Sequence, residues 1–292
     1  MHLLVTGAGG QLGTELRSLA VAHPAVTALT AVDVGDLELT DGVAVRSAVA
    51  ALGRDPVVVN AAAWTDVDGA ETQEAAAYAV NATAPAVLAA ACAERRAPLL
   101  HVSTDYVFAG DRTDGRPYAP TDEPRPATAY GRTKLAGEQA VRALHPDGGQ
   151  VVRTAWLYGQ GRNFARTMAR LAVERETVEV VGDQHGSPTW ARDLAAGLLA
   201  LAVLRPPAAV WHLTGAGHTT WYGFAREVFR LTGHDPDRVR PTTTAAFASA
   251  TPRPAWSVLD GTGWLDAGLP APRAWEVSLG EAVRTGHVVD AR

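Results

Sequence analysis

A tyrosine and a lysine four positions apart are the residues of this sequence best placed to do chemistry together. Lys134 is the only lysine in 292 residues; the remaining 25 of the 26 basic residues are arginine, and Tyr130 precedes it by four. On a helix this spacing places an ammonium one turn from a phenol. A nearby positive charge lowers the pKa of a phenol from about 10 and predicts a proton donor or acceptor near neutral pH. The alternative is an exposed helix position where the lysine falls by chance.

Glycines near the amino terminus predict a phosphate-binding turn. The apolar run His2 to Thr6 leads into Gly7, Gly10 and Gly13, and a helix is expected to begin near Gln11. Gly7 permits a tight turn, Gly10 lets a diphosphate approach the backbone, and Gly13 allows close packing of helix on strand. Amides at the helix start would hold the phosphates. We expect dinucleotide binding by Gly7, Gly10, Gln11, Leu12 and Gly13; the alternative is a purely structural turn.

The ends of the next two strands predict the rest of a dinucleotide site. Asp33 ends the run Val26 to Val32, where a carboxylate accepts a hydrogen bond from a ribose 2′-hydroxyl and repels a 2′-phosphate. No arginine follows, which favours NADH over NADPH, although an ordinary strand-end aspartate is an equal interpretation. Small residues after the buried strand Pro56 to Asn60 leave room for the cofactor: Ala61, Ala62 and Ala63. Asn81, between two expected helices, is a helix cap or a polar group near the cofactor.

The next strand and helix bring the reactive groups together. The strand Leu99 to Val102 ends in Ser103, Thr104 and Asp105, and the helix that carries Tyr130 runs to about Leu144. Ligands of open α/β sheets bind at the carboxyl ends of strands, so hydroxyls are expected to meet the phenol and the ammonium there. The loop from Ala109 to Pro126 is rich in Pro, Gly and Asp and could cover the site as a lid.

The alternation of these elements predicts an α/β fold, a Rossmann-like doubly wound parallel sheet over residues 1–154. A fifth strand, Gln150 to Thr154, closes that part. Residues 155–292 are expected to form mainly a smaller substrate-binding region, and the strand Val178 to Val181 is expected to return to the sheet.

Composition excludes several classes of partner. A net charge of -5 gives no basic surface for nucleic acid or for anionic membranes. The single Cys92 predicts a buried small hydrophobe, and the absence of an intrachain disulfide fits a reducing cytoplasm. The start of the chain does not read as a signal peptide, and the apolar run Leu194 to Leu204 is too short to cross a bilayer. We expect a cytoplasmic protein without a membrane partner.

Several strings together resemble the extended short-chain dehydrogenase/reductases and, more narrowly, the dTDP-4-dehydrorhamnose reductase family. The resemblance covers nearly the whole chain in order. It rests on Gly7, Gly10 and Gly13; on the STDYVF string from Ser103 to Phe108; on Tyr130, Gly131, Lys134, Gly137 and Glu138; on Arg153, Thr154, Trp156, Tyr158 and Gly159; on Asn163 and Phe164; on Gly186, Pro188 and Thr189; on Thr219 to Tyr222; and on Arg253, Pro254, Ser257 and Leu259.

The resemblance implies a role for each matching residue. Tyr130 would donate a proton to a substrate carbonyl, Lys134 would hold the nicotinamide ribose and lower the tyrosine pKa, and Thr104 would hydrogen-bond near the reacting oxygen. Asp105 and Trp156 would contact the sugar, Trp156 having core packing as its alternative. Arg253 would hold the substrate diphosphate, because a guanidinium suits two phosphate oxygens. The implied cofactor is NADPH, with NADH accepted or preferred.

The implied reaction transfers hydride to C4 of a nucleotide-linked 4-keto-6-deoxysugar, with dTDP-4-dehydro-L-rhamnose as the leading substrate. Another dTDP-deoxysugar of antibiotic biosynthesis, including a dihydrostreptose-type product, stays open. A sugar dehydratase would carry Glu after the Asp of the strand end, whereas Tyr106 follows Asp105 here. A regulatory subunit that binds nucleotide without turnover is the non-enzyme alternative, and the presence of Thr104, Tyr130 and Lys134 together argues against it.

The same resemblance bears on metal and assembly. Some members of the family dimerise through a magnesium ion held by glutamates, one of them in the helix after the Gly-Ser-Pro-Thr loop. Arg192 occupies that place here. We therefore expect no metal site and a monomer or a homodimer without a magnesium bridge.

Overall fold

Six parallel strands form the central sheet of the computed structural model, which describes residues 1–207, 209–247 and 251–289. Their order is β10-β5-β4-β3-β1-β2. The order reverses between β1 and β3, and ligands of such sheets bind beside the reversal, at the carboxyl ends of the strands. The bounds are β1 (His2–Thr6), β2 (Ala28–Val32), β3 (Pro56–Asn60), β4 (Leu99–Thr104), β5 (Gly149–Thr154) and β10 (Val210–His212).

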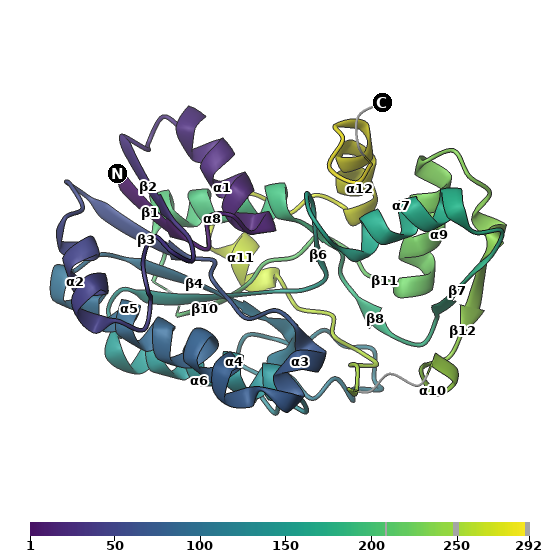
Figure 1. Ribbon diagram of the computed structural model, residues 1–292, viewed down its shortest axis with the longest axis horizontal. Helices are drawn as coiled ribbons and strands as arrows, with labels where there is room; N and C mark the ends of the chain where they lie inside the picture. Colours follow the sequence, from purple (N-terminus) through teal and green to yellow (C-terminus); the bar gives the residue numbers. More distant parts are fainter. Residues whose placement is uncertain (208, 248–250, 290–292) are drawn as a thin grey trace.

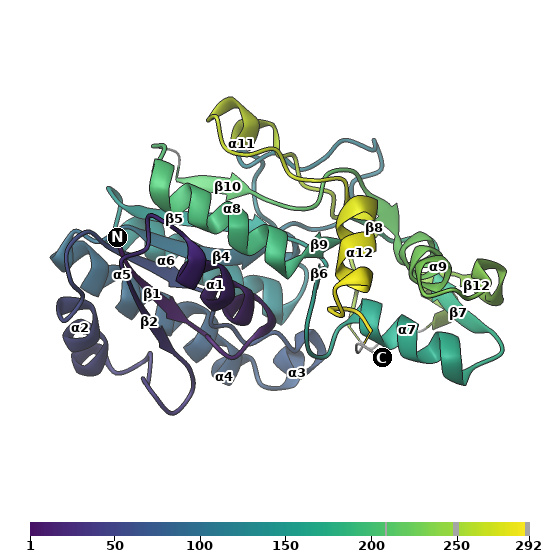
Figure 2. The same cartoon turned by 90° about the horizontal axis from the view of Figure 1, so that it is seen from above.

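Helices cover both faces of this sheet (Figures 1 and 2). One face carries α1 (Gln11–Ala22) and α8 (Ala191–Leu204), and the other carries α2 (Gly42–Ala50), α5 (Ala84–Arg95) and α6 (Ala129–Leu144). The prediction of a doubly wound parallel sheet is confirmed.

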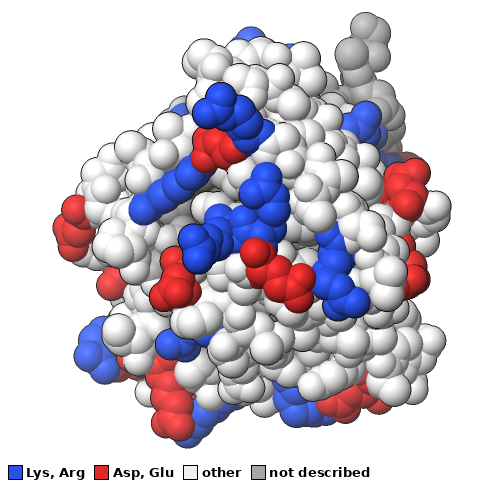
Figure 3. All heavy atoms as spheres, turned by 90° about the vertical axis from the view of Figure 1, so that its left-hand side faces the viewer, with Lys and Arg blue, Asp and Glu red and all other residues white. Residues whose placement is uncertain are grey.

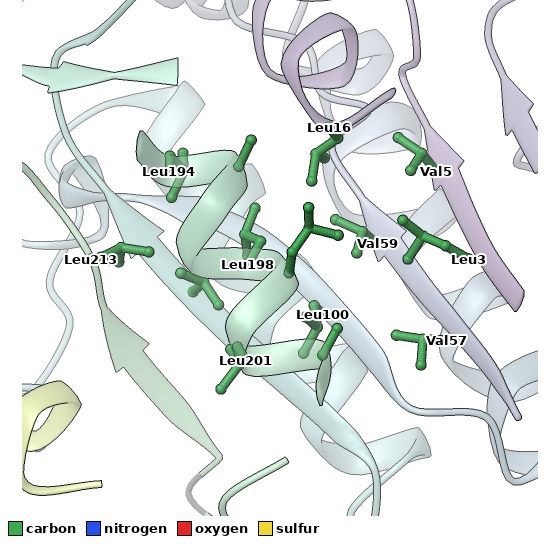
Figure 4. Packing of buried hydrophobic residues seen from close by; sticks show 14 of the residues in the cluster. Leu3, Val5, Leu16, Val57, Val59, Leu100, Leu194, Leu198, Leu201 and Leu213 are labelled. Atoms are coloured by element: carbon green, nitrogen blue, oxygen red, sulfur yellow. The ribbon is translucent and has the colours of Figure 1, made fainter. Parts of the chain in front are cut away.

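Apolar side chains fill both interfaces between sheet and helices. Leu3 and Val5 of β1 pack on the α1 and α8 side, whereas Leu4 packs on the α2 and α5 side. Leucines of α8, among them Leu194 and Leu198, point toward the sheet strands in Figure 4. A strand buried on both faces has no polar side to alternate with, which explains the continuous apolar runs in the sequence.

A second region forms around its own core. It contains α7 (Phe164–Glu174), α9 (Trp221–Leu231) and α12 (Trp275–Arg284), with Trp190 and Phe224 buried among them. Three two-stranded sheets belong to it: β7 (Val178–Val181) with β12 (Val239–Thr242), β8 (His185–Gly186) with β11 (Thr219–Thr220), and β6 (Leu157–Tyr158) with β9 (Thr189–Trp190). The remaining helices are α3 (Val67–Thr72), α4 (Glu74–Tyr78), a π-helical turn (Ala79–Thr83), 3₁₀ turns Asp105–Val107 and Pro236–Arg238, α10 (Thr244–Phe247) and α11 (Thr262–Asp266).

The prediction that Val178–Val181 returns to the main sheet is wrong. This strand pairs in parallel with β12 in the second region, and the strand that returns is β10, three residues long. Helix α8 and Trp264 of α11 also pack into the core beside the sheet. The chain therefore passes from one region to the other more than once, which a single boundary at residue 154 does not describe.

One helical stretch of the described chain, Glu74–Arg95, is long and apolar enough to cross a membrane by length and composition alone. Half of its most apolar part is buried inside the protein, as in the core helices of soluble proteins, so the stretch is weak evidence for a membrane span.

On the face of the molecule at the left of Figure 1, basic and acidic side chains lie beside one another (Figure 3).

Candidate active site

A cleft of about 720 Å³ lies along the carboxyl ends of the sheet strands. It brings together residues from the glycine turn, from the ends of β2 to β5, from α6 and from the second region. The predicted site residues that line it are Gly7, Gly10, Gln11, Leu12, Gly13, Asp33, Ala61, Ala62, Ala63, Thr104, Asp105, Tyr130, Lys134 and Trp156. Two others, Asn81 and Arg253, do not line it.

The glycine turn has the geometry that the sequence predicted. Gly7 has φ +67°, and a Cβ there would stand 2.6 Å from the Ala62 nitrogen. A Cβ at Gly13 would stand 2.1 Å from the Gly7 oxygen, so only glycine lets α1 approach the strand so closely. The turn forms a cradle at the helix start whose amides suit the diphosphate of a dinucleotide.

Asp33 is built into this turn. Its carboxylate accepts hydrogen bonds from the backbone nitrogens of Gly9 and, at 2.7 Å, of Val34. These bonds hold a negative charge at one end of the cleft, where the sequence predicted a ribose. They also leave the carboxylate tied to the backbone, which limits how far it can move away from a 2′-phosphate.

Asn60, which was not predicted as a site residue, supports the alanine turn that lines the cleft. Its side-chain oxygen accepts from the Thr6 hydroxyl at 2.6 Å and from the Ala62 nitrogen at 3.2 Å. Its nitrogen lies 3.0 Å from Nδ1 of His101, whose pKa burial lowers well below the usual value. This network fixes the alanine turn at the end of β3. A buried asparagine at a strand end was the available signal.

Asn81 hydrogen-bonds two segments that lie beside the cleft. It is fully buried in the π-helical turn, bonds to the nitrogen (2.9 Å) and oxygen (3.1 Å) of Trp64, and donates to the Thr133 hydroxyl at 3.1 Å. Neither expectation holds, because it caps no helix and lines no part of the cleft. The reason is tertiary: Asn81 joins the loop after β3 to α6.

Helix α6 places the phenol and the ammonium beside the end of β4. Thr128 begins the helix by accepting a hydrogen bond from the Gly131 nitrogen at 3.0 Å. The Tyr130 ring stands edge-on to Tyr106, with centroids 5.5 Å apart. Lys134 is buried, and its ammonium donates to the Val102 oxygen at 2.7 Å. Thr104, Tyr130 and Lys134 all line the cleft, so the structure brings the three predicted catalytic residues together.

The expectation that Lys134 lowers the pKa of Tyr130 is wrong for this structure. Burial raises the pKa of Tyr130 above its usual value, and hydrogen bonding with Thr104 offsets only part of the rise. Burial also lowers the pKa of Lys134 to about 8, against the opposing charge of Glu138. A phenol in this state keeps its proton at neutral pH and is a proton donor rather than a base.

Three buried polar atoms in the cleft wall have no hydrogen-bond partner among the described residues: Ser103 Oγ, Asp105 Oδ2 and Thr154 Oγ1. Burial raises the pKa of Asp105 to about 6, although Thr104 donates to its other oxygen at 3.0 Å. Buried polar atoms are normally paired, so this wall is suited to a polar ligand.

Trp156 forms an aromatic platform at the junction of the two regions. It has φ +47°, uncommon for a residue other than glycine, and it stacks on Trp221 with centroids 3.6 Å apart and planes at 8°. A Cβ at Gly186 would stand 2.3 Å from the indole, so glycine is required to house it. Strain of this kind clusters at functional sites, which favours a binding role over simple core packing.

Arg253 lies beside the cleft rather than in it. Its guanidinium pairs with Asp68 at 2.7 Å and lines a hollow of about 30 Å³ with Tyr106. The loop predicted as a lid does not line the cleft either. Backbone hydrogen bonds tie it to residues 255–260. The Gly110 oxygen accepts from the nitrogens of Ala255 and Trp256, and the Tyr118 nitrogen donates to the Val258 oxygen at 2.8 Å.

Arg192, at the place where the resemblance sets a metal-binding glutamate in some family members, makes an ion pair within the chain. Its guanidinium lies 3.1 Å from Oε2 of Glu15, and His287 lies 2.9 Å from Oε1 of the same buried carboxylate. Glu15 therefore already has two basic partners.

Comparisons with known proteins agree on one family. A family model described as "RmlD substrate binding domain" matches residues 1–287. The chain is 52% identical to a dTDP-4-dehydrorhamnose reductase of Streptomyces griseus, over 96% of this chain and 92% of that protein. It is 49% identical to a dTDP-4-keto-6-deoxy-D-glucose reductase of Streptomyces niveus, over 96% and 95%.

The fold is also that of a solved structure. A dTDP-4-dehydrorhamnose reductase of Bacillus anthracis, in complex with NADP, superposes with a TM-score of 0.91 and 34% identity, covering 97% of this chain and 99% of that one.

Proposed function

The chain belongs to the dTDP-4-dehydrorhamnose reductase family, and from that membership we propose that it reduces the C4 carbonyl of dTDP-4-dehydro-L-rhamnose to give dTDP-L-rhamnose. It is an NAD(P)H-dependent oxidoreductase. The glycine turn, Asp33 and the alanine turn after β3 would hold the dinucleotide. When bound, the reduced nicotinamide supplies the hydride.

The observation that carries this proposal is the meeting of Thr104, Tyr130 and Lys134 in the cleft. Tyr130 keeps its proton because it is buried, so it can donate to the oxygen of a carbonyl that gains hydride. Thr104 would orient that oxygen. Lys134 lines the cleft, its ammonium bonded to the backbone of β4, and it would hold the nicotinamide ribose.

The substrate side of the cleft would bind the sugar nucleotide through Asp105 and the Trp156 platform. We also propose Arg253 as a contact for the substrate diphosphate, supported by its position near Tyr106 at the edge of the cleft. We further propose that the protein is cytoplasmic and that it is a monomer or a homodimer without a magnesium bridge. The Arg192–Glu15 ion pair supports the absence of that bridge.

A second candidate is reduction of another dTDP-4-keto-6-deoxysugar. It is favoured by the 49% identity to the Streptomyces niveus reductase, which is named for a different sugar. A dehydratase is not favoured, because Tyr106 rather than a glutamate follows Asp105.

Oxidation of NADPH and of NADH by the purified protein with dTDP-4-dehydro-L-rhamnose tests the proposal directly. We expect turnover with formation of dTDP-L-rhamnose, identified by chromatography against a standard. Turnover only with another dTDP-4-keto-6-deoxysugar would reject the rhamnose assignment. Dinucleotide binding without turnover of any such sugar would favour the regulatory subunit.

Replacing Asp33 with serine is expected to shift cofactor preference toward NADPH. The change removes a carboxylate that repels the 2′-phosphate. The ratio of kcat/KM for NADPH to that for NADH should rise about tenfold, equivalent to roughly 1.4 kcal/mol. Glu38→Ser is the matched control, because Glu38 is an exposed carboxylate after the same strand whose side chain bonds Thr40 and does not line the cleft. An unchanged ratio would mean that Asp33 serves only the turn.

A further inference from the structure

A segment of the second region lies against the phosphate-binding turn. Asn163 donates to the side-chain oxygen of Gln11 at 3.1 Å, and also to the backbone oxygens of Gly159 at 2.7 Å and Gly161 at 3.1 Å. A Cβ at Gly161 would stand 3.8 Å from the Gln11 side chain. Because Gln11 is the first residue of α1, residues 159–163 are held next to the amides of the glycine turn.

This segment places a guanidinium in the cleft. Arg162 lines the cleft together with Gly10 and Gln11, and it is exposed. Within the described part of the chain it makes no hydrogen bond or ion pair. The described lining residues include two basic side chains, Arg162 and Lys134, and the ammonium of Lys134 already donates to Val102. Of these two basic groups, Arg162 is therefore the one that remains available to bind an anion in the cleft.

We propose that Arg162 binds the diphosphate of the dinucleotide and completes the site begun by the glycine turn. A diphosphate carries two negative charges, whereas backbone amides offer only partial positive charge. The planar fork of a guanidinium can donate to two phosphate oxygens at once. The inference rests on the proposed function only in taking a dinucleotide as the ligand of the cleft.

The test compares Arg162→Gln with the unmodified protein in binding alone. Dissociation constants for NADPH and NADH are measured by quenching of tryptophan fluorescence, without sugar, at low and at high salt. Loss of one charge-assisted contact should raise the dissociation constants of both dinucleotides by about tenfold at low salt. The dissociation constant of the variant should also depend less on salt, because one charged contact is missing. Arg162→Lys should recover part of the affinity.

Arg170→Gln is the matched control. Arg170 lies on α7, pairs with Glu174 and does not line the main cleft, so its loss should leave binding unchanged. Affinity of Arg162→Gln within twofold of the unmodified protein would overturn the proposal. A raised KM for the sugar nucleotide with unchanged dinucleotide binding would also overturn it, by assigning Arg162 to the other diphosphate. Because binding is measured without sugar, an error in the proposed substrate would leave this result intact.

Discussion

Replacing Tyr130 with phenylalanine should lower turnover by about 10²- to 10⁴-fold, the range typical of losing a general acid. The change removes one hydroxyl and leaves the ring, so the edge-on packing against Tyr106 at 5.5 Å is kept. Dinucleotide affinity should stay near that of the unmodified protein. Steady-state kinetics with saturating sugar, together with fluorescence titration of NADPH, measures both quantities.

Tyr118→Phe is the control for removal of a buried tyrosine hydroxyl. The Tyr118 hydroxyl has no hydrogen-bond partner among the described residues, and the side chain lies outside the cleft. Its loss should change turnover little. If Tyr130→Phe kept turnover within threefold of the unmodified enzyme, another group would have to supply the proton, and the assignment of Tyr130 would be rejected.

The second large effect concerns stability. Arg153 of β5 and Glu138 of α6 form a buried ion pair, each side chain 3% exposed, with hydrogen bonds of 2.7 to 3.2 Å. The guanidinium also lies 5.0 Å from the Phe108 ring. Glu138→Gln leaves a buried charge without its partner, which should lower the free energy of unfolding by about 3–5 kcal/mol. Urea denaturation followed by circular dichroism gives this quantity.

Two further variants distinguish the cost of leaving Arg153 unpaired in the core from the cost of losing an ion pair as such. Glu138→Leu combined with Arg153→Met removes both charges and should recover most of the stability, because a buried pair can often be replaced by apolar residues of similar volume. Glu174→Gln breaks the exposed pair with Arg170 and should cost no more than about 1 kcal/mol. A loss below 1 kcal/mol for Glu138→Gln would show that water or another group compensates Arg153.

The sequence by itself determined the features that depend on short spacing along the chain. A strand followed by Gly7 and Gly13 produces the turn because the steric demand lies within a few residues and the neighbouring strand. Tyr130 and Lys134 share a face of α6 because helical geometry fixes residues four apart. Apolar runs buried on both sides predicted a parallel sheet covered by helices, and this too is what the structure has.

Only the tertiary structure decided which distant segments meet and how deeply each group is buried. The three-residue β10 joins the sheet while the longer β7 does not, since partner choice depends on the packing of α8 and the second region rather than on strand propensity. Arg162 lines the same cleft as the glycine turn because the neighbouring Asn163 hydrogen-bonds Gln11 across 152 positions. The pKa of Tyr130 rises because desolvation outweighs hydrogen bonding with Thr104, and desolvation is a property of the assembled cleft, which no spacing in the sequence encodes.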